Sequence, residues 1–144
     1  MKKVYYNKLV RDRIKDKIEG KGEACAIRVI DDVAEYEQEL LKKVIEEASA
    51  LAHTRTRTEF LAEYADLMVV LDALTHHLEF SEADIKTALA ENVEKKGLYK
   101  LRHFLHWSAD SDYQSNETPQ GLKWNFSLHH CLWCRKRMVQ SICR

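Results

Sequence analysis

The amino-acid sequence predicts an all-α fold, a bundle of helices with a short extended segment near residues 23–30. Three observations indicate this class. Apolar residues recur at spacings of three and four through most of the chain. Only 4 Gly and 1 Pro occur in 144 residues, so long uninterrupted helices are permitted. Hydrophobic residues make up 45% and charged residues 32%, which is typical of a soluble helical protein.

Composition also narrows the function classes. Lys plus Arg and Asp plus Glu number 23 each, so no excess charge predicts binding to nucleic acid or to a membrane. No apolar run approaches the ~20 residues of a membrane span, and residues 1–7 lack the apolar core of a signal peptide. The 4 Cys are too few for a disulfide framework. The resulting expectation is a cytoplasmic protein.

The N-terminal part is basic. Residues 1–8 are expected to be extended, and a short helix is expected over residues 9–19, before two glycines. One interpretation is that Lys8 and Arg11 contact a triphosphate, because their cations match phosphate oxygens in charge and hydrogen-bonding geometry. The alternative is a solvated face, on which Arg11 pairs with the adjacent Asp12.

Two long helices joined by a short turn form the centre of the predicted bundle. The first follows the extended segment and is capped by Asp31 or Asp32. The turn covers about residues 53–58, and Thr58 is expected to cap the second long helix, which runs to about Leu78. A turn of this length places the two helices antiparallel and in contact.

The second long helix is apolar over most of its circumference. One stripe alternates spacings of four and three: Phe60, Tyr64, Leu67, Leu71, Leu74 and Leu78. Such a helix belongs in an interior or in an oligomer core. The predicted bundle therefore completes its core by association into a homodimer or a homotetramer. His76 and His77, near the end of this helix, are expected to face the helix dipole rather than to bind metal.

A fourth helix and a polar extension complete the chain. The helix is expected from Ser81, where Ser81 and Asp84 resemble a capping box, to Gly97. The predicted domain covers residues 1–107, and residues 108–144 are expected to form a polar linker and a loosely ordered extension.

The extension contains a Cys-x-x-Cys motif, Cys131 to Cys134, next to His129 and His130. Adjacent histidines have poor chelating geometry, so zinc is not expected there. The basic residues of this tail are weak evidence for nucleic-acid binding: Arg135, Lys136, Arg137 and Arg144.

Carboxylates on the two long helices form the candidate site. Glu63 and Asp66 lie three residues apart on one face of an apolar helix, where negative charge without a partner is costly. In a hairpin, Glu47 lies opposite Asp66 and Ala50 opposite Glu63. Oxygen ligands suit Mg²⁺, or alternatively Mn²⁺, so Glu47, Glu63 and Asp66 are the predicted metal ligands. Glu46 is expected on the exposed side of its helix.

These motifs resemble the MazG-like all-α nucleoside triphosphate pyrophosphohydrolases, and their phosphoribosyl-ATP pyrophosphohydrolase-like branch in particular. The family signature is Glu-Glu-x-x-Glu followed by Glu-x-x-Asp, and the resemblance covers about residues 5–117. The matching stretches are Tyr6-Asn7-Lys8-Leu9-Val10-Arg11-Asp12-Arg13-Ile14, Val29-Ile30-Asp31-Asp32, Glu46-Glu47-Ala48-Ser49-Ala50, Glu63-Tyr64-Ala65-Asp66 and Phe104-Leu105-His106-Trp107-Ser108. One departure is Ala50, which replaces the third glutamate.

The resemblance implies Mg²⁺-dependent hydrolysis of a nucleoside triphosphate to the monophosphate and pyrophosphate, a house-cleaning reaction on the nucleotide pool. Either Glu47 or Glu63 would accept the proton of the attacking water. The alternative, favoured by Ala50, is a catalytically weakened or inactive protein of this fold that acts as a nucleotide-binding or oligomeric module.

Substrate contacts are expected at both ends of the domain. Lys8 and Arg11 would hold the outer phosphates. In the related enzymes the fourth helix closes over the nucleotide, which makes Asn92 and Lys95 candidate contacts. For these two residues a solvated helix face is the alternative.

Overall fold

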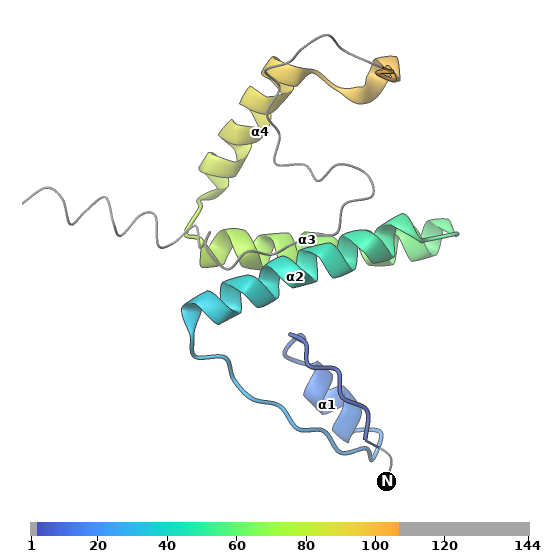
Figure 1. Ribbon diagram of the computed structural model, residues 1–144, viewed down its shortest axis with the longest axis vertical. Coiled ribbons are helices and arrows are strands. Elements are labelled where there is room, and N and C mark those ends of the chain that lie inside the picture. The colour runs from blue at the N-terminus through green and yellow to red at the C-terminus, as the bar shows by residue number, and fades with distance from the viewer. Residues whose placement is uncertain (1–2, 107–144) are drawn as a thin grey trace, which may run out of the picture. The chain divides into compact units, whose positions relative to one another are not determined.

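The computed structural model describes residues 3–106 (Figure 1), so the predicted extension over residues 108–144 lies outside the described part. The elements are α1 (Ile14–Glu19), α2 (Val33–Ala52), α3 (Arg57–His77), α4 (Glu82–Lys96) and the 3₁₀ turn η1 (Tyr99–Leu101). Within residues 3–106 there is no strand, and residues 23–30 have no regular secondary structure. The all-α class is therefore confirmed for the described residues.

The chain divides into two units at the start of α4. The first unit ends at Ser81 and contains α1, α2 and α3, and the second begins at Glu82 and contains α4 and η1. In the described part, no helix has both the length and the apolar character needed to cross a membrane.

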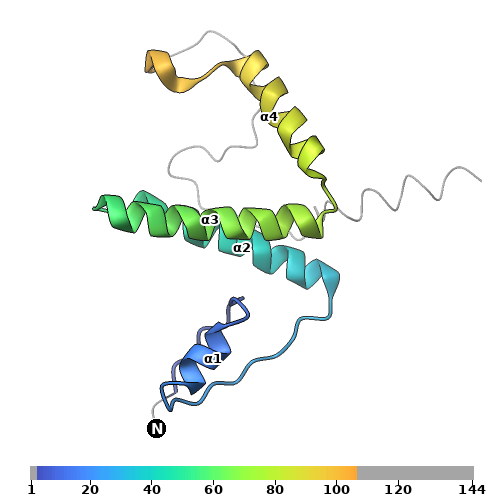
Figure 2. The same ribbon diagram turned by 180° about the vertical axis from the view of Figure 1, so that it is seen from behind.

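Helices α2 and α3 form an antiparallel hairpin, in which they lie side by side along their length (Figures 1 and 2). Leu40 and Val70, which are 2% and 7% exposed, are its buried apolar residues within the described part. Partly buried apolar residues continue the seam at helical spacing: Val44 and Leu51 on α2, and Leu67, Leu71 and Leu74 on α3. The periodicity of the sequence thus becomes one continuous contact between two helices.

The N-terminal cap of α2 is Asp32, which decides between the two candidate aspartates. The Asp32 side chain accepts a hydrogen bond from the backbone N–H of Glu35 at 2.6 Å. This bond satisfies one of the backbone donors that the first turn of a helix leaves unpaired.

The expected cap of α3 at Thr58 is wrong, because Thr56 caps this helix. The Thr56 hydroxyl accepts a hydrogen bond from the Glu59 backbone N–H at 3.1 Å. The Glu59 carboxylate in turn accepts from the backbone N–H groups of Thr56 and Arg55, at 3.3 Å and 2.8 Å. The glutamate three residues after Thr56 completes a capping box, and Thr58 has no acidic residue at that spacing.

The other end of the turn is also closed by side chains. His53 Nδ1 donates to the carbonyl of Ser49 at 2.7 Å, and the Thr54 hydroxyl donates to the carbonyl of Leu51 at 2.9 Å. Both bonds satisfy carbonyls that the last turn of α2 would leave unpaired. A turn fixed on both sides sets the register between α2 and α3.

Helix α1 is shorter than the predicted span of residues 9–19, because it begins at Ile14. The preceding residues are not helical, and Asn7 has a φ of 45°. Lys8 and Arg11 extend from this segment to carboxylates on the hairpin. Residues 9–13, for which the sequence predicted a helix, are therefore non-helical and include Arg11, which forms a long-range ion pair.

In the second unit, α4 has the predicted position. It ends before Gly97, whose φ of 76° is a conformation that glycine adopts without strain. All its residues are exposed in the described structure, including the apolar Ile85, Leu89 and Val93.

Candidate metal centre

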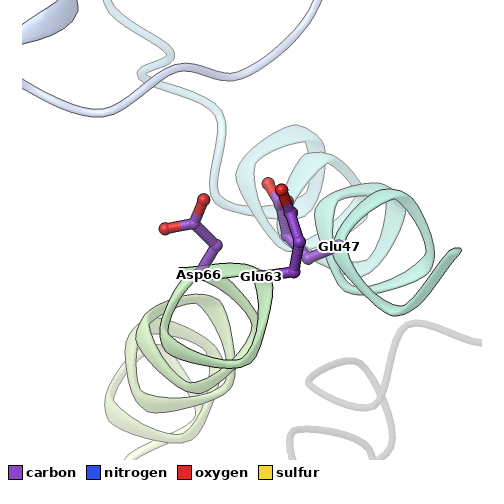
Figure 3. Close-up of side chains that lie close together, drawn as sticks. All are labelled: Glu47, Glu63 and Asp66. Atoms are coloured by element: carbon purple, nitrogen blue, oxygen red, sulfur yellow. The ribbon is translucent and has the colours of Figure 1, made fainter. Parts of the chain in front are cut away.

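Three carboxylates gather where α2 and α3 pack together. Glu47 comes from α2, and Glu63 and Asp66 come from α3; one oxygen from each lies within 4.8 Å of the others. Figure 3 shows the three side chains pointing to the same side of the hairpin. All three are partly buried. We call these three residues the acidic cluster.

The acidic cluster occupies core-facing positions of the hairpin. Glu47 lies seven residues after the buried Leu40, and Asp66 and Glu63 lie four and seven residues before the buried Val70. Two turns of an α-helix return to the same face after seven residues, so the carboxylates continue the apolar seam towards the turn. The register that the turn fixes is therefore what brings Glu47 opposite the two carboxylates of α3.

Lys43 provides a cation from the same helix as Glu47. Its Nζ donates to Glu47, four residues on, and lies 3.2 Å from Glu46 Oε1. Partial burial works to lower the pKa of Lys43, but hydrogen bonds to Glu47 and Glu46 outweigh burial and raise the pKa. Lys43 therefore stays charged and neutralises part of the acidic cluster.

The N-terminal segment provides two further cations. Lys8 Nζ lies 2.7 Å from Glu46 Oε1, and Arg11 Nη2 lies 2.6 Å from Asp66 Oδ1. The hydrogen bond from Lys8 lowers the pKa of Glu46 against the opposing effect of burial. The alternative pairing of Arg11 with Asp12 does not occur. Arg11 therefore contacts the acidic cluster directly, whereas Lys8 contacts Glu46, the neighbour of Glu47 in the chain.

The acidic cluster keeps a net negative charge. Lys43 pairs with Glu47 and Arg11 pairs with Asp66, whereas Glu63 has no ion pair with any residue in 3–106. Three carboxylates against two cations leave one negative charge. Such a charge near a seam between helices favours binding of a cation.

The geometry fits a divalent cation. Two oxygens bound to one octahedral Mg²⁺ at about 2.0–2.1 Å lie roughly 2.9 Å apart when adjacent and roughly 4.2 Å apart when opposite. Oxygens within 4.8 Å of one another would therefore need to approach by up to about 2 Å, a distance that rotation of a carboxylate side chain can cover. Ca²⁺, whose ligands lie at about 2.3–2.6 Å, would require a smaller approach of the oxygens than Mg²⁺.

The other positions considered in the sequence do not contribute an oxygen to the acidic cluster. Ala50 lies one turn after Glu47 on α2, is partly buried, and offers no ligand oxygen. Asn92 and Lys95 lie exposed on α4 in the second unit, where their contact with a nucleotide stays a prediction. Glu46 is on the exposed side of α2 as expected, with 41% of its side chain exposed.

Sequence reasoning missed a second polar group in the hairpin. Glu37 is buried, and its Oε2 lies 4.0 Å from His77 Nε2, a buried atom without a hydrogen bond in the described structure. The His77 ring packs edge-on against Tyr36 at 5.1 Å. His77 thus faces the seam, not only the helix dipole. The hairpin pairing that sets Glu47 opposite Asp66 also sets Tyr36 opposite His77, so this signal was present in the sequence.

Comparison with protein-family models, with curated proteins and with solved structures finds no match to this chain. The MazG-like resemblance therefore rests on the motifs given above. The acidic cluster stands apart from that resemblance, because its geometry follows from the packing of α2 against α3.

Proposed function

We propose that this chain is a Mg²⁺-dependent nucleoside triphosphate pyrophosphohydrolase that acts on the cytoplasmic nucleotide pool. One observation carries the proposal: Glu47, Glu63 and Asp66 bring oxygens within 4.8 Å of one another across a helical hairpin. Arg11 contacts Asp66 of this cluster and Lys8 contacts Glu46, next to Glu47 in the chain, so both cations are available to the phosphates of a nucleotide.

The three carboxylates would hold Mg²⁺, or Mn²⁺ in its place. When bound, the cation would neutralise charge on the phosphate oxygens and polarise the attacking water. Lys43 already donates to Glu47, whereas Glu63 has no ion pair within residues 3–106. We therefore assign proton acceptance from the water to Glu63, and a ligand and orienting role to Glu47.

The reaction breaks the phosphoanhydride bond between the α- and β-phosphates. The oxygen of water bonds to the phosphorus on one side of this bond and its proton passes to Glu63. The bridging P–O bond breaks, and the nucleoside monophosphate and pyrophosphate separate. Lys8 and Arg11 would bind the outer phosphates, and Asn92 and Lys95 of α4 would contribute further contacts to the nucleotide. These four residues bind and orient the substrate, while the acidic cluster carries the chemistry.

Self-association belongs to the same proposal. Large apolar residues on α3 are 46% to 56% exposed: Phe60, Leu61, Tyr64, Met68 and Val69. A second copy of the hairpin would cover this face and complete the core, in a homodimer or a homotetramer. Burial of such a face is the main source of stability for helices of this length.

The test is a panel of ribo- and deoxyribonucleoside triphosphates incubated with the full chain and Mg²⁺, Mn²⁺, Ca²⁺ or a chelator. We expect equal amounts of monophosphate and pyrophosphate with Mg²⁺ or Mn²⁺, and neither product with chelator. Release of orthophosphate and the diphosphate would contradict the proposal, because a different bond would have been broken.

Ala50 favours a second candidate, a nucleotide-binding or oligomeric protein that has lost activity. The position one turn after Glu47 lacks a carboxylate, so the metal would have three protein ligands from this cluster. This candidate predicts nucleotide binding that depends on metal, measured by calorimetry, without release of pyrophosphate from any member of the panel.

A further inference from the structure

Two ion pairs join the N-terminal segment, residues 3–13, to the hairpin, and only one of them involves the acidic cluster. Lys8 binds Glu46, which lies outside the acidic cluster, whereas Arg11 binds Asp66, which belongs to it. The side chains of Arg11 and Asp66 are 53% and 41% exposed. Solvent therefore reaches the Arg11–Asp66 pair, and exposed pairs of this kind are weak.

We propose that Arg11 is a displaceable counter-ion of Asp66, which leaves this carboxylate when a divalent cation binds and then contacts the phosphates of the nucleotide. The inference rests on the proposed function, since it requires the acidic cluster to hold a metal. The metal does not compete for the Lys8–Glu46 pair, because Glu46 is not one of the proposed metal ligands.

Electrostatics decides whether Arg11 leaves or stays. A guanidinium bound to one oxygen of Asp66, while the other oxygen holds a metal, would lie roughly 5 Å from a doubly charged ion. The three carboxylates together with Lys43 carry a net charge of about −2, so a divalent ion neutralises them without Arg11 and repels its guanidinium. Arg11 therefore loses its place on Asp66.

Lys43 differs from Arg11 in its surroundings. Its side chain is 18% exposed, it lies on α2 itself, and it contacts both Glu46 and Glu47. If Glu47 binds a metal, Lys43 can still pair with Glu46, which is not a member of the acidic cluster. Of the two cations on the acidic cluster, Arg11 is the one that becomes free for a new acceptor.

This exchange orders the binding steps. Without metal, the charge of Arg11 is satisfied by Asp66, so little attraction remains for phosphate. With metal bound, the guanidinium is released within reach of the site, and the triphosphate offers oxygens that bind it in a bidentate manner. Metal binding thus precedes the Arg11–phosphate contact.

The experiment measures the affinity of the full chain for Mn²⁺ without nucleotide, by titration calorimetry, in the parent, Arg11→Gln and Arg13→Gln. Arg13 is exposed in the same segment and has no ion pair within residues 3–106, so Arg13→Gln removes the same charge as a matched control. We expect Arg11→Gln to bind Mn²⁺ about two- to fivefold more tightly than the parent. Arg13→Gln should match the parent.

A second measurement uses the parent alone. Trypsin cleavage after Arg11, followed by mass spectrometry of the N-terminal fragment, should become faster on addition of Mg²⁺. An unchanged cleavage rate, or equal Mn²⁺ affinity in Arg11→Gln and Arg13→Gln, would overturn the inference. Weaker binding by Arg11→Gln would also overturn it, because Arg11 would then support Asp66 as a ligand.

The outcomes distinguish failure of the proposed function from failure of this inference alone. If the parent binds no divalent cation, the proposed function and this inference both fall. If the parent binds metal and releases pyrophosphate, while Arg11→Gln has unchanged affinity, only the role of Arg11 as a displaceable counter-ion falls.

Discussion

The three carboxylates of the acidic cluster differ in how their negative charge is compensated. Lys43 compensates Glu47, Arg11 compensates Asp66, and Glu63 has no ion pair with a described residue. A cation bound by all three carboxylates would remove the repulsion among them, whereas Lys43 and Arg11 each pair with one carboxylate of the cluster. Binding of a divalent ion is therefore expected to depend on every member of the cluster.

Replacing Asp66 with Asn keeps the shape of the side chain and removes its charge. We expect Asp66→Asn to lower the affinity for Mg²⁺ at least about tenfold, since it removes a direct ligand and removal of mere supporting groups already costs about 10–100-fold. Pyrophosphate release should fall with it. Asp72→Asn, the same change at an exposed position of α3, is the control. Equal Mg²⁺ affinity in both variants would show that Asp66 is not a ligand.

Lys8 stabilises the ionised form of Glu46, which gives a pH dependence of known sign. The pKa of Glu46 is lowered in the folded state, so its pairing adds stability above the ordinary glutamate pKa, and this is lost as pH falls through the lowered value. We expect Lys8→Gln to raise the pKa of Glu46 and to lower the free energy of unfolding at pH 7 by less than about 1 kcal/mol, because the pair is exposed.

Carbon-detected NMR titration of Glu46 and urea unfolding at two pH values check this expectation. The difference in stability between Lys8→Gln and the parent should shrink as pH falls through the lowered pKa of Glu46, and disappear once Glu46 is protonated in the folded state. Lys17→Gln, on α1 without an ion pair in the described part, serves as the reference variant. A stability difference that persists at low pH would mean that Lys8 acts through packing and not through charge.

At the scale of the helices, the sequence predicted the hairpin and the acidic cluster because both depend on local patterns. Periodicity places Glu63 and Asp66 on the inner face of α3, and the short turn then places Glu47 opposite them. The contact between Arg11 and Asp66 joins residues 55 positions apart. No periodic pattern encodes such a pair, which is also why the late start of α1 at Ile14 was not predicted.

The register of the hairpin predicts what a carboxylate at position 50 would do. In Ala50→Glu, the new side chain should enter the acidic cluster opposite Glu63, and repulsion between like charges should lower the melting temperature in chelator. Mg²⁺ should recover this loss, because it binds the folded state preferentially. Melting curves of parent and variant, each with Mg²⁺ and with chelator, give the measurement.

The Ala50→Glu variant also tests the role of position 50 in pyrophosphate release. Pyrophosphate release by Ala50→Glu should equal or exceed that of an active parent, and should appear anew if the parent has lost activity. A Mg²⁺-dependent rise in melting temperature no larger than that of the parent would mean that position 50 does not face the metal, so that the alignment of the two acidic segments is wrong.

At the scale of the whole molecule, the described chain buries little apolar surface. Leu40 and Val70 are the buried apolar residues within residues 3–106, whereas Leu61 and Met68 on α3 are 56% and 46% exposed. A helical hairpin with so small an interior has little to offset the conformational entropy lost on folding. We expect the protein to gain its stability by pairing this face of α3 with a second copy.

Sedimentation at micromolar concentration checks this expectation. The parent should sediment as a dimer or tetramer, and Met68→Lys should shift it to smaller species with a lower melting temperature, because a charge would enter the interface. Lys86→Met, the reverse exchange at an exposed position of α4, should leave the assembly unchanged. A well-folded parent monomer at this concentration would refute self-association through α3.

The closeness in sequence of the three carboxylates has a consequence for the order of folding. The helices that carry Glu47 and Asp66 are joined by a turn of a few residues, so the acidic cluster assembles as soon as α2 and α3 meet. Contacts between neighbouring elements form early, because closing a loop of about 10 residues takes roughly 10–100 ns. The Arg11–Asp66 pair closes a much longer loop and carries a larger entropic cost. We therefore expect the three carboxylates to come together before Arg11 pairs with Asp66. Divalent ions in the refolding buffer should then accelerate formation of the hairpin and slow the docking of the N-terminal segment.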